Sequence, residues 1–122
     1  MKILILDDVP EYVRSLKRAL TMDYEVVSAH DLDEAKENMD SSTDLALVDV
    51  RLSEEDIENR EGLSFLKWTK ENYPNIPVVM MSAYKDFEAV KESWDLEAEK
   101  FLKKPINLKE LRALISSFDK EG

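Results

Sequence analysis

The chain has 122 residues, enough for one domain with a sizeable core, and its lack of cysteine excludes disulfide bonds and thiolate chemistry. Its 27 acidic and 17 basic residues give a formal net charge of -10, so we do not expect this domain to bind nucleic acid directly. Two glycines are too few for a glycine-rich phosphate loop, and without a signal-peptide pattern or an apolar run of ~20 residues we expect a soluble, cytoplasmic protein with no membrane contact.

Strands and helices are expected to alternate along the whole chain. Short apolar runs predict the strands, and apolar residues at helical spacing predict the helices. In chain order, the expected strands are residues 2–6, 25–29, 44–50, 78–81 and 100–103. The expected helices are residues 10–22, 31–39, a stretch after Glu61 that carries Leu63, Phe65, Leu66 and Trp68, then residues 86–94 and 108–118.

This alternation predicts a doubly wound α/β domain. Residues 44–50 are almost continuously apolar, as in a strand that is covered on both faces of a parallel sheet. Right-handed crossovers then place helices on both faces, which gives three layers. Asp31, with Glu34 three positions later as in a capping box, and Asn107 are the expected N-caps of two helices. Trp68 and Trp94 are expected to be packing residues.

Polar residues stand where the strands end. Asp7 and Asp8 follow the first strand, Asp49 closes the third, Ser82 follows the fourth and Lys104 follows the fifth. Carboxyl ends of parallel strands share one edge, where ligands of open α/β sheets bind. Each residue also has a simpler interpretation: a loop exit for Asp49, helix caps for the Asp7-Asp8 pair and Ser82, and a surface position for Lys104. Their occurrence together favours a shared site.

Three carboxylates at one edge require a cation. A pair about 4 Å apart costs roughly 4 kcal/mol at an effective dielectric constant of ~20, and one lysine does not offset that. A hard divalent ion with oxygen ligands, Mg2+ with Mn2+ as the alternative, is the natural complement. Such a site can transfer a phosphoryl group to a carboxylate, with the hydroxyl and the ammonium binding phosphoryl oxygens.

Four segments together resemble the receiver domain of two-component response regulators. They are Leu6-Asp7-Asp8, Val48-Asp49, Met81-Ser82-Ala83 and Phe101-Leu102-Lys103-Lys104-Pro105. The resemblance covers essentially the whole chain. It implies a CheY-like, flavodoxin-like fold with strand order 2-1-3-4-5 over residues 1–119, followed by a tail at 120–122.

The resemblance also implies roles for the strand-end residues. Asp49 would accept a phosphoryl group from a histidine kinase or a histidine phosphotransfer protein. Mg2+ would be held by Asp7, Asp8, Asp49 and the backbone carbonyl of Arg51. Ser82 and Lys104 would contact the phosphoryl group, and the Lys104-Pro105 peptide bond would be cis. Lys103 is the competing lysine, and strand alternation should turn it away from the site.

Ser82 and Phe101 stand where receivers carry the hydroxyl and the aromatic that pass on the signal. We expect phosphorylation to draw Ser82 inward and Phe101 to turn into the vacated space, although Phe101 can equally be a plain core residue. The change would reshape the face made by the fourth helix, the fifth strand and the fifth helix. A downstream protein or effector domain would read that face, which could also form a homodimer.

The chain departs from the family pattern in three places. Ser53 replaces a usual proline, and the acidic stretch 53–61, either a solvated loop or a partner contact, delays the glycine that follows. Arg51 and Tyr84, two positions beyond Asp49 and Ser82, are bulky enough to obstruct water, which predicts a long-lived phosphoaspartate. The usual Gly-Ala pair before the last strand is Glu97-Ala98, where we expect a local change in the turn.

Two other functions share parts of this pattern. A pseudo-receiver that binds partners without phosphorylation is disfavoured by the complete acidic set. A haloacid dehalogenase-type phosphohydrolase needs a second acid two residues after its nucleophile, where this chain has Arg51. We therefore expect a switch that catalyses only its own phosphoryl transfer and loss, rather than an enzyme with turnover. It would act as a stand-alone regulator or as the receiver of a larger protein.

Overall fold

The computed structural model describes residues 1–53, 59–82 and 87–119. Within these ranges the chain alternates five strands with five helices, as the apolar patterns predict. The strands are β1 (Lys2–Leu6), β2 (Glu25–Ala29), β3 (Leu45–Asp49), β4 (Val78–Ser82) and β5 (Lys100–Lys103). The helices are α1 (Pro10–Leu20), α2 (Leu32–Asn38), α3 (Glu61–Asn72), α4 (Phe87–Asp95) and α5 (Leu108–Phe118). None of the described helices is long and apolar enough to span a membrane.

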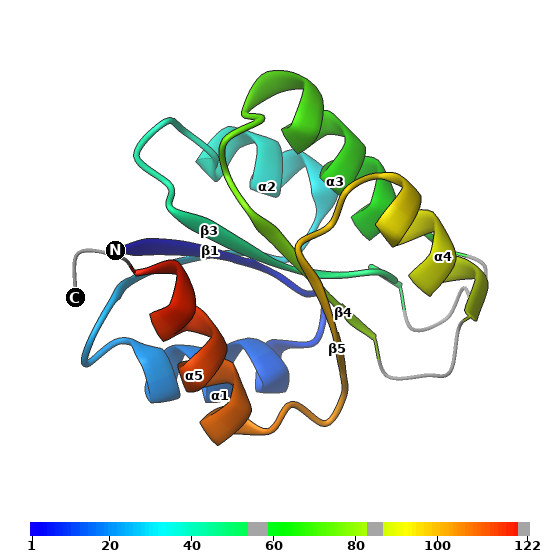
Figure 1. Cartoon of the computed structure of the whole chain (residues 1–122). Coiled ribbons are helices and arrows are strands. Elements are labelled where there is room, and N and C mark those ends of the chain that lie inside the picture. The colour runs from blue at the N-terminus through cyan, green and yellow to red at the C-terminus, as the bar shows by residue number, and fades with distance from the viewer. Residues whose placement is uncertain (54–58, 83–86, 120–122) are drawn as a thin grey trace.

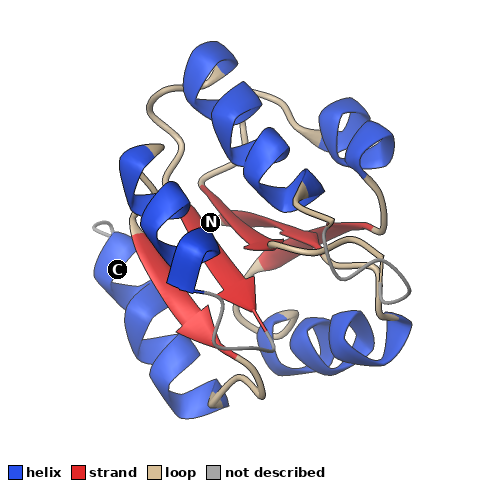
Figure 2. Ribbon diagram, turned by 90° about the vertical axis from the view of Figure 1, so that its right-hand side faces the viewer, coloured by secondary structure: helices blue, strands red, loops and turns tan. Residues whose placement is uncertain are grey.

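All neighbouring strands pair in parallel, in the order β2-β1-β3-β4-β5. Figure 1 shows α1 and α5 on one face of the sheet and α2, α3 and α4 on the other. The view turned by 90° shows the strands between these two helical layers (Figure 2). The expected doubly wound, flavodoxin-like fold with strand order 2-1-3-4-5 is confirmed.

Strand alternation divides the core into two halves, one on each face of the sheet. Toward α1 and α5, side chains such as Ile5 and Leu47 pack with Leu16 and Leu111. Toward α2, α3 and α4, the intervening strand residues pack with side chains such as Phe65. The sheet is therefore buried on both faces, which explains why β3 and β4 contain almost no polar residues.

Two of the predicted helix caps are present. Asp31 Oδ1 accepts a hydrogen bond from Glu34 N at 2.8 Å, and Asn107 Oδ1 accepts one from Glu110 N at 3.0 Å. The reciprocal bond of the capping box is shifted by one residue, because Glu34 Oε1 accepts from His30 N at 2.7 Å. His30, an exposed residue, is therefore part of the cap of α2.

The first helix begins without an aspartate cap. Its N-cap residue is Val9, which makes no side-chain capping bond, and Pro10 occupies the first helical turn. Asp7 Oδ1 instead accepts a hydrogen bond from Val9 N at 2.9 Å, which fixes the turn between β1 and α1. The simpler interpretation of Asp7 and Asp8 as the N-cap of α1 is therefore wrong.

Helix α4 ends in a left-handed residue that is not glycine. Glu97 has a φ of 66°, Glu97 N donates to Trp94 O, and Ala98 N donates to Ser93 O. This bonding pattern is a Schellman motif, in which glycine usually takes the left-handed position. The local change expected at Glu97-Ala98 is thus a helix end closed by a side-chain-bearing residue.

The two tryptophans differ in their surroundings. Trp68 stacks on Phe65, with ring centroids 5.5 Å apart, as expected of a packing residue. Trp94 is 48% exposed, so its interpretation as a packing residue is wrong. The neighbouring Ser93 is buried, and its Oγ donates to Val90 O at 2.7 Å. Since adjacent residues on a helix point about 100° apart, Ser93 takes the inward direction and Trp94 faces out.

Candidate functional site: an acidic cluster at the strand ends

Four of the predicted residues meet at the carboxyl edge of the sheet: Asp7, Asp8, Asp49 and Lys104. Asp7 follows β1 in the register of Ile3 and Ile5, and Asp49 closes β3 in the register of Leu45 and Leu47. Two backbone bonds continue the ladders beyond the strands: Asp7 N donates to Ala29 O at 3.1 Å, and Lys104 N donates to Ser82 O at 2.7 Å. The sheet itself therefore positions the site.

Lys104 is the basic residue of the site. Its side chain is 4% exposed, and its Nζ lies 2.7 Å from Asp7 Oδ2 and 3.3 Å from Asp49 Oδ2. The same nitrogen lies 4.3 Å from the centroid of the Tyr12 ring. Lys103 is exposed, as strand alternation predicts, and the Lys104-Pro105 peptide bond is cis, as the family resemblance implies.

Burial and the neighbouring charges together shift the pKa values of Asp49 and Lys104. Burial raises the pKa of Asp49 to about 7, helped by the neighbouring Asp7 and Asp8 and opposed by the Lys104 ammonium. Burial alone would lower the pKa of Lys104, but the ion pair with Asp49 and the hydrogen bond to Asp7 outweigh it, so this pKa is raised. The lysine stays charged, whereas Asp49 is held close to its protonation equilibrium.

A divalent cation fits this cluster. Asp7, Asp8 and Asp49 each offer a carboxylate oxygen, and these oxygens lie within 4.8 Å of one another. Asp7 and Asp49 are buried, and Asp8 is partly buried. Carboxylate oxygens are the ligands that Mg2+ prefers, and a buried group of three gains most from the ion's charge. Burial is the main cause of the raised pKa of Asp49, and the negative charges of Asp7 and Asp8 add to it.

Gly62 positions Asp49, a role that no sequence motif indicates. A Cβ atom on Gly62 would lie 1.8 Å from Asp49 O and 2.7 Å from Val50 Cα. Gly62 N also donates to Val50 O at 2.9 Å. The start of α3 therefore packs directly on the backbone of the central carboxylate. The sequence does hint at a special role for Gly62, because the chain has only two glycines and the other is its last residue.

Asn59 connects the two ends of the acidic stretch after β3 by hydrogen bonds. Its Oδ1 accepts hydrogen bonds from Leu52 N and from Glu61 N, both at 3.0 Å. Its Nδ2 donates to Glu61 Oε1 at 2.7 Å. One asparagine thus joins the two ends of the 53–61 stretch and leads into α3. Residues 54–58 lie outside the described residues, so the two interpretations of this stretch both stand as predictions.

The remaining predicted residues lie around this centre. Ser82 is buried at the end of β4, in the register that faces α2, α3 and α4, and partly buried Phe101 packs against the core on that same face. Arg51 is partly buried, two residues beyond Asp49. Tyr84 lies outside the described residues. The roles of these four residues in switching and hydrolysis remain predictions.

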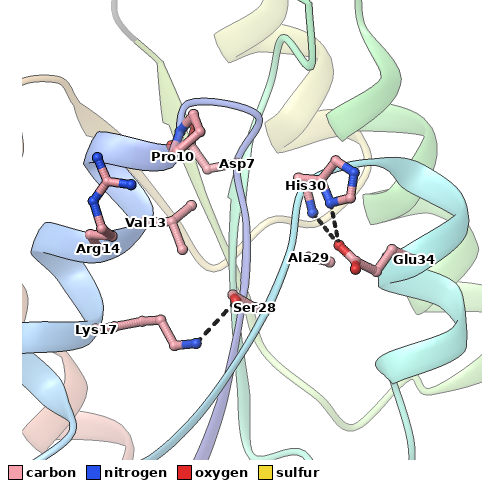
Figure 3. Close-up of a pocket in the computed structure, with 9 residues that line it drawn as sticks. All are labelled: Asp7, Pro10, Val13, Arg14, Lys17, Ser28, Ala29, His30 and Glu34. Atoms are coloured by element: carbon pink, nitrogen blue, oxygen red, sulfur yellow. Dashed lines mark hydrogen bonds and ion pairs between the residues drawn. The ribbon is translucent and has the colours of Figure 1, made fainter.

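A separate hollow of about 390 Å3 adjoins Asp7, between α1 and the connection from β2 to α2 (Figure 3). On its α1 wall, Lys17 Nζ lies 3.3 Å from Ser28 Oγ. On the opposite wall, His30 Nδ1 lies 2.6 Å from Glu34 Oε1, so the histidine is engaged with the cap of α2. The hollow shares Asp7 with the acidic cluster, and its other lining residues come from α1, the end of β2, His30 and α2.

Comparisons with known proteins agree with this geometry. The family model of the response regulator receiver domain matches residues 3–116. The DNA-binding transcriptional regulator NtrC of Proteus hauseri is 34% identical over 113 residues, which cover 91% of this chain and 23% of that protein. The transcriptional regulatory protein CpxR of Escherichia coli strain K12 is 34% identical over 115 residues, 93% of this chain and 47% of that protein.

A solved structure shows the same likeness along its whole length. The CheY-like response regulator receiver domain protein of Methanospirillum hungatei JF-1 superposes with a TM-score of 0.83 at 29% identity, over 99% of this chain and 98% of that one. The chain spans about a quarter to a half of the length of the curated relatives named above. The chain belongs to the family of response regulator receiver domains, the receiving modules of two-component systems.

Proposed function

We propose that Asp49 accepts a phosphoryl group from a phosphohistidine, carried by a histidine kinase or a histidine phosphotransfer protein. One observation carries the proposal: the buried Lys104 ammonium lies against both Asp7 and Asp49 in a group of three converging carboxylates. A group with this surplus of negative charge suits a metal ion and an incoming phosphoryl group better than it suits a purely structural ion pair.

The carboxylates of Asp7, Asp8 and Asp49, with the backbone carbonyl of Arg51, would hold Mg2+, or Mn2+ in its place. The bound ion would neutralise charge on the phosphoryl oxygens during transfer. Asp49, whose pKa of about 7 leaves part of the acceptor protonated at neutral pH, would release its proton to solvent and be ionised beside a bound cation. These residues supply hard oxygen donors, which fits either ion.

In the proposed transfer, an Asp49 carboxylate oxygen attacks phosphorus, the new P–O bond forms and the P–N bond of the donor breaks. The departing imidazole nitrogen keeps the bonding electron pair and takes a proton from solvent. Lys104 would pair with a phosphoryl oxygen, and Ser82 would donate a hydrogen bond to another. The reaction changes the protein itself, so we propose a switch rather than an enzyme with turnover.

The residues that would pass on the signal, Ser82 and Phe101, lie in the register that faces α2, α3 and α4. Phosphorylation would draw Ser82 toward the phosphoryl group and let Phe101 turn inward, which reshapes the face of α4, β5 and α5. A downstream protein or an effector domain would read that face, and two copies could pair through it. We propose no direct nucleic-acid contact by this domain, because its net charge is -10.

The test is intact mass spectrometry after incubation with Mg2+ and acetyl phosphate. We expect one phosphoryl adduct in the wild type and none in Asp49→Asn or in the presence of EDTA. The decay of the adduct, compared with Arg51→Ala and Tyr84→Ala, tests the predicted long lifetime, since removing either side chain should speed the loss. A folded wild type that binds Mg2+ yet forms no adduct would instead support a pseudo-receiver.

A further inference from the structure

A tyrosine on the first turn of α1 covers the lysine of the site. The Lys104 Nζ lies 4.3 Å from the centroid of the Tyr12 ring, within the range of a cation–π contact. We propose that Tyr12 is a positioning residue, which holds the Lys104 ammonium in place for the phosphoryl group when a metal ion occupies the carboxylates. This inference rests on the proposed function and assigns to it a residue that is not among the strand-end residues.

The burial of Lys104 makes this contact strong. An ammonium group has three N–H donors, and two of them can be directed at Asp7 Oδ2 and Asp49 Oδ2. The ring of Tyr12 provides a third direction of attraction without a lone-pair acceptor. With the lysine side chain 4% exposed, water screens little of the attraction, and cation–π contacts reach their larger values at such desolvated positions.

The metal ion and the lysine compete for the same oxygens. Asp7 and Asp49 are both partners of Lys104 and members of the carboxylate group that fits a divalent ion. When an ion binds there, it weakens both ion pairs and repels the ammonium. Among the described contacts of Lys104 Nζ, the ring is the one that a metal ion does not compete for. Tyr12 would therefore matter most in the metal-loaded protein.

A neutral partner also suits the proposed chemistry. A third carboxylate beside Lys104 would hold the ammonium equally well, but it would cancel the charge that the phosphoryl oxygens need. The π face attracts the cation through its quadrupole and adds no net negative charge. Tyr12 can thus fix the position of Lys104 and leave its full positive charge available.

The experiment compares Tyr12→Leu, Tyr12→Phe and the wild type. The first readout is the NMR signal of the Lys104 side-chain ε protons, which lie against the ring and should be shifted upfield by it, with Lys104→Arg used to assign the signal. The second readout is the rate of phosphorylation by saturating acetyl phosphate, together with the Mg2+ concentration at half-maximal rate. Tyr73→Leu, which removes a partly buried tyrosine ring that contacts Trp68, is the matched control.

We expect Tyr12→Leu to lose the upfield shift and to slow the maximal rate about tenfold, with the half-saturating Mg2+ concentration changed by less than about threefold. Tyr12→Phe should restore both readouts, and Tyr73→Leu should change neither. An unshifted Lys104 signal in the wild type, or a Tyr12→Leu rate within about twofold of the wild type, would overturn the inference. Failure of the wild type to form any adduct would refute the proposed function, while the NMR readout would still report on the contact.

Discussion

The protonation of Asp49 is set by its surroundings rather than by its own chemistry. Burial and the two neighbouring aspartates raise its pKa to about 7, against the attraction of Lys104. The folded, metal-free protein therefore binds this proton more tightly than the unfolded chain does. Between pH ~4 and ~7 the folded state holds more protons, so the free energy of unfolding falls as pH rises through that interval.

The fall in the free energy of unfolding with rising pH can be measured. In EDTA, the free energy of unfolding of the wild type should fall between pH 5 and pH 7.5 by more than about 1 kcal/mol beyond any fall in Asp49→Asn. Denaturant unfolding measures both proteins. The asparagine cannot titrate, so its own stability should follow only the other groups of the chain. Parallel pH profiles for the two proteins would show that Asp49 has an ordinary pKa.

For individual residues, the sequence predicts which side chains meet at the site but not which tertiary contacts fix their positions. Strand alternation distinguishes Lys104 from Lys103, and parallel pairing brings Asp7 and Asp49 to one edge. The contact between Tyr12, on the first turn of α1, and Lys104, just after β5, joins residues 92 positions apart, and no local pattern encodes it. Such contacts depend on tertiary distances.

The start of α3 provides the sharpest prediction for a whole element. Gly62→Ala would ordinarily strengthen a helix by roughly 0.5–1 kcal/mol. Here the added Cβ would lie 1.8 Å from Asp49 O, and the contact is with backbone that cannot turn aside. We expect a loss of about 3 kcal/mol or more in the free energy of unfolding, together with weaker Mg2+ binding as Asp49 is displaced.

Ser64→Ala is the matched control for Gly62→Ala, because Ser64 is exposed on the same helix. Its stability should change by less than about 0.5 kcal/mol. Denaturant unfolding and a Mg2+ titration measure both variants. If Gly62→Ala matched the control in both measurements, the close approach of α3 to Asp49 would be wrong.

All ten elements could be predicted from the sequence, because short apolar runs mark the strands, and apolar residues at helical spacing or capping residues mark the helices. The boundaries differ by one or two residues: the helix expected over 10–22 ends at Leu20, and the strand expected over 44–50 is Leu45–Asp49. Helix ends depend on capping bonds, as at Glu97, where the left-handed turn follows from Schellman bonds and not from a glycine. The identity of that residue gave no sign of the conformation.

For the whole molecule, the acidic balance and the acidic cluster make separate predictions about cations. A net charge of -10 should make any salt stabilising through screening, whereas a specific site should respond to divalent ions at much lower ionic strength. We expect Mg2+ at 100 times its Kd to stabilise the fold by about 2.7 kcal/mol, by mass action on the folded state.

Thermal unfolding separates the two effects. MgCl2 should raise Tm well above the value in NaCl of equal ionic strength, and Asp8→Asn should lose this difference. The same variant should be at least as stable as the wild type in EDTA, because it removes one of three converging charges. An equal response of the wild type to both salts would exclude a specific divalent site.

The alternation of side chains along β3, β4 and β5 places the acceptor and the switch residues on opposite faces of the sheet. Asp49 lies in the register that faces α1 and α5, whereas Ser82 and Phe101 lie in the register that faces the other helical layer. For a phosphorylation switch, the sheet would then lie between the acceptor Asp49 and the switch residues Ser82 and Phe101. Substitutions at Phe101, unlike those at Ser82, would then change how the domain meets its partners and leave the phosphoryl chemistry at Asp49 unchanged.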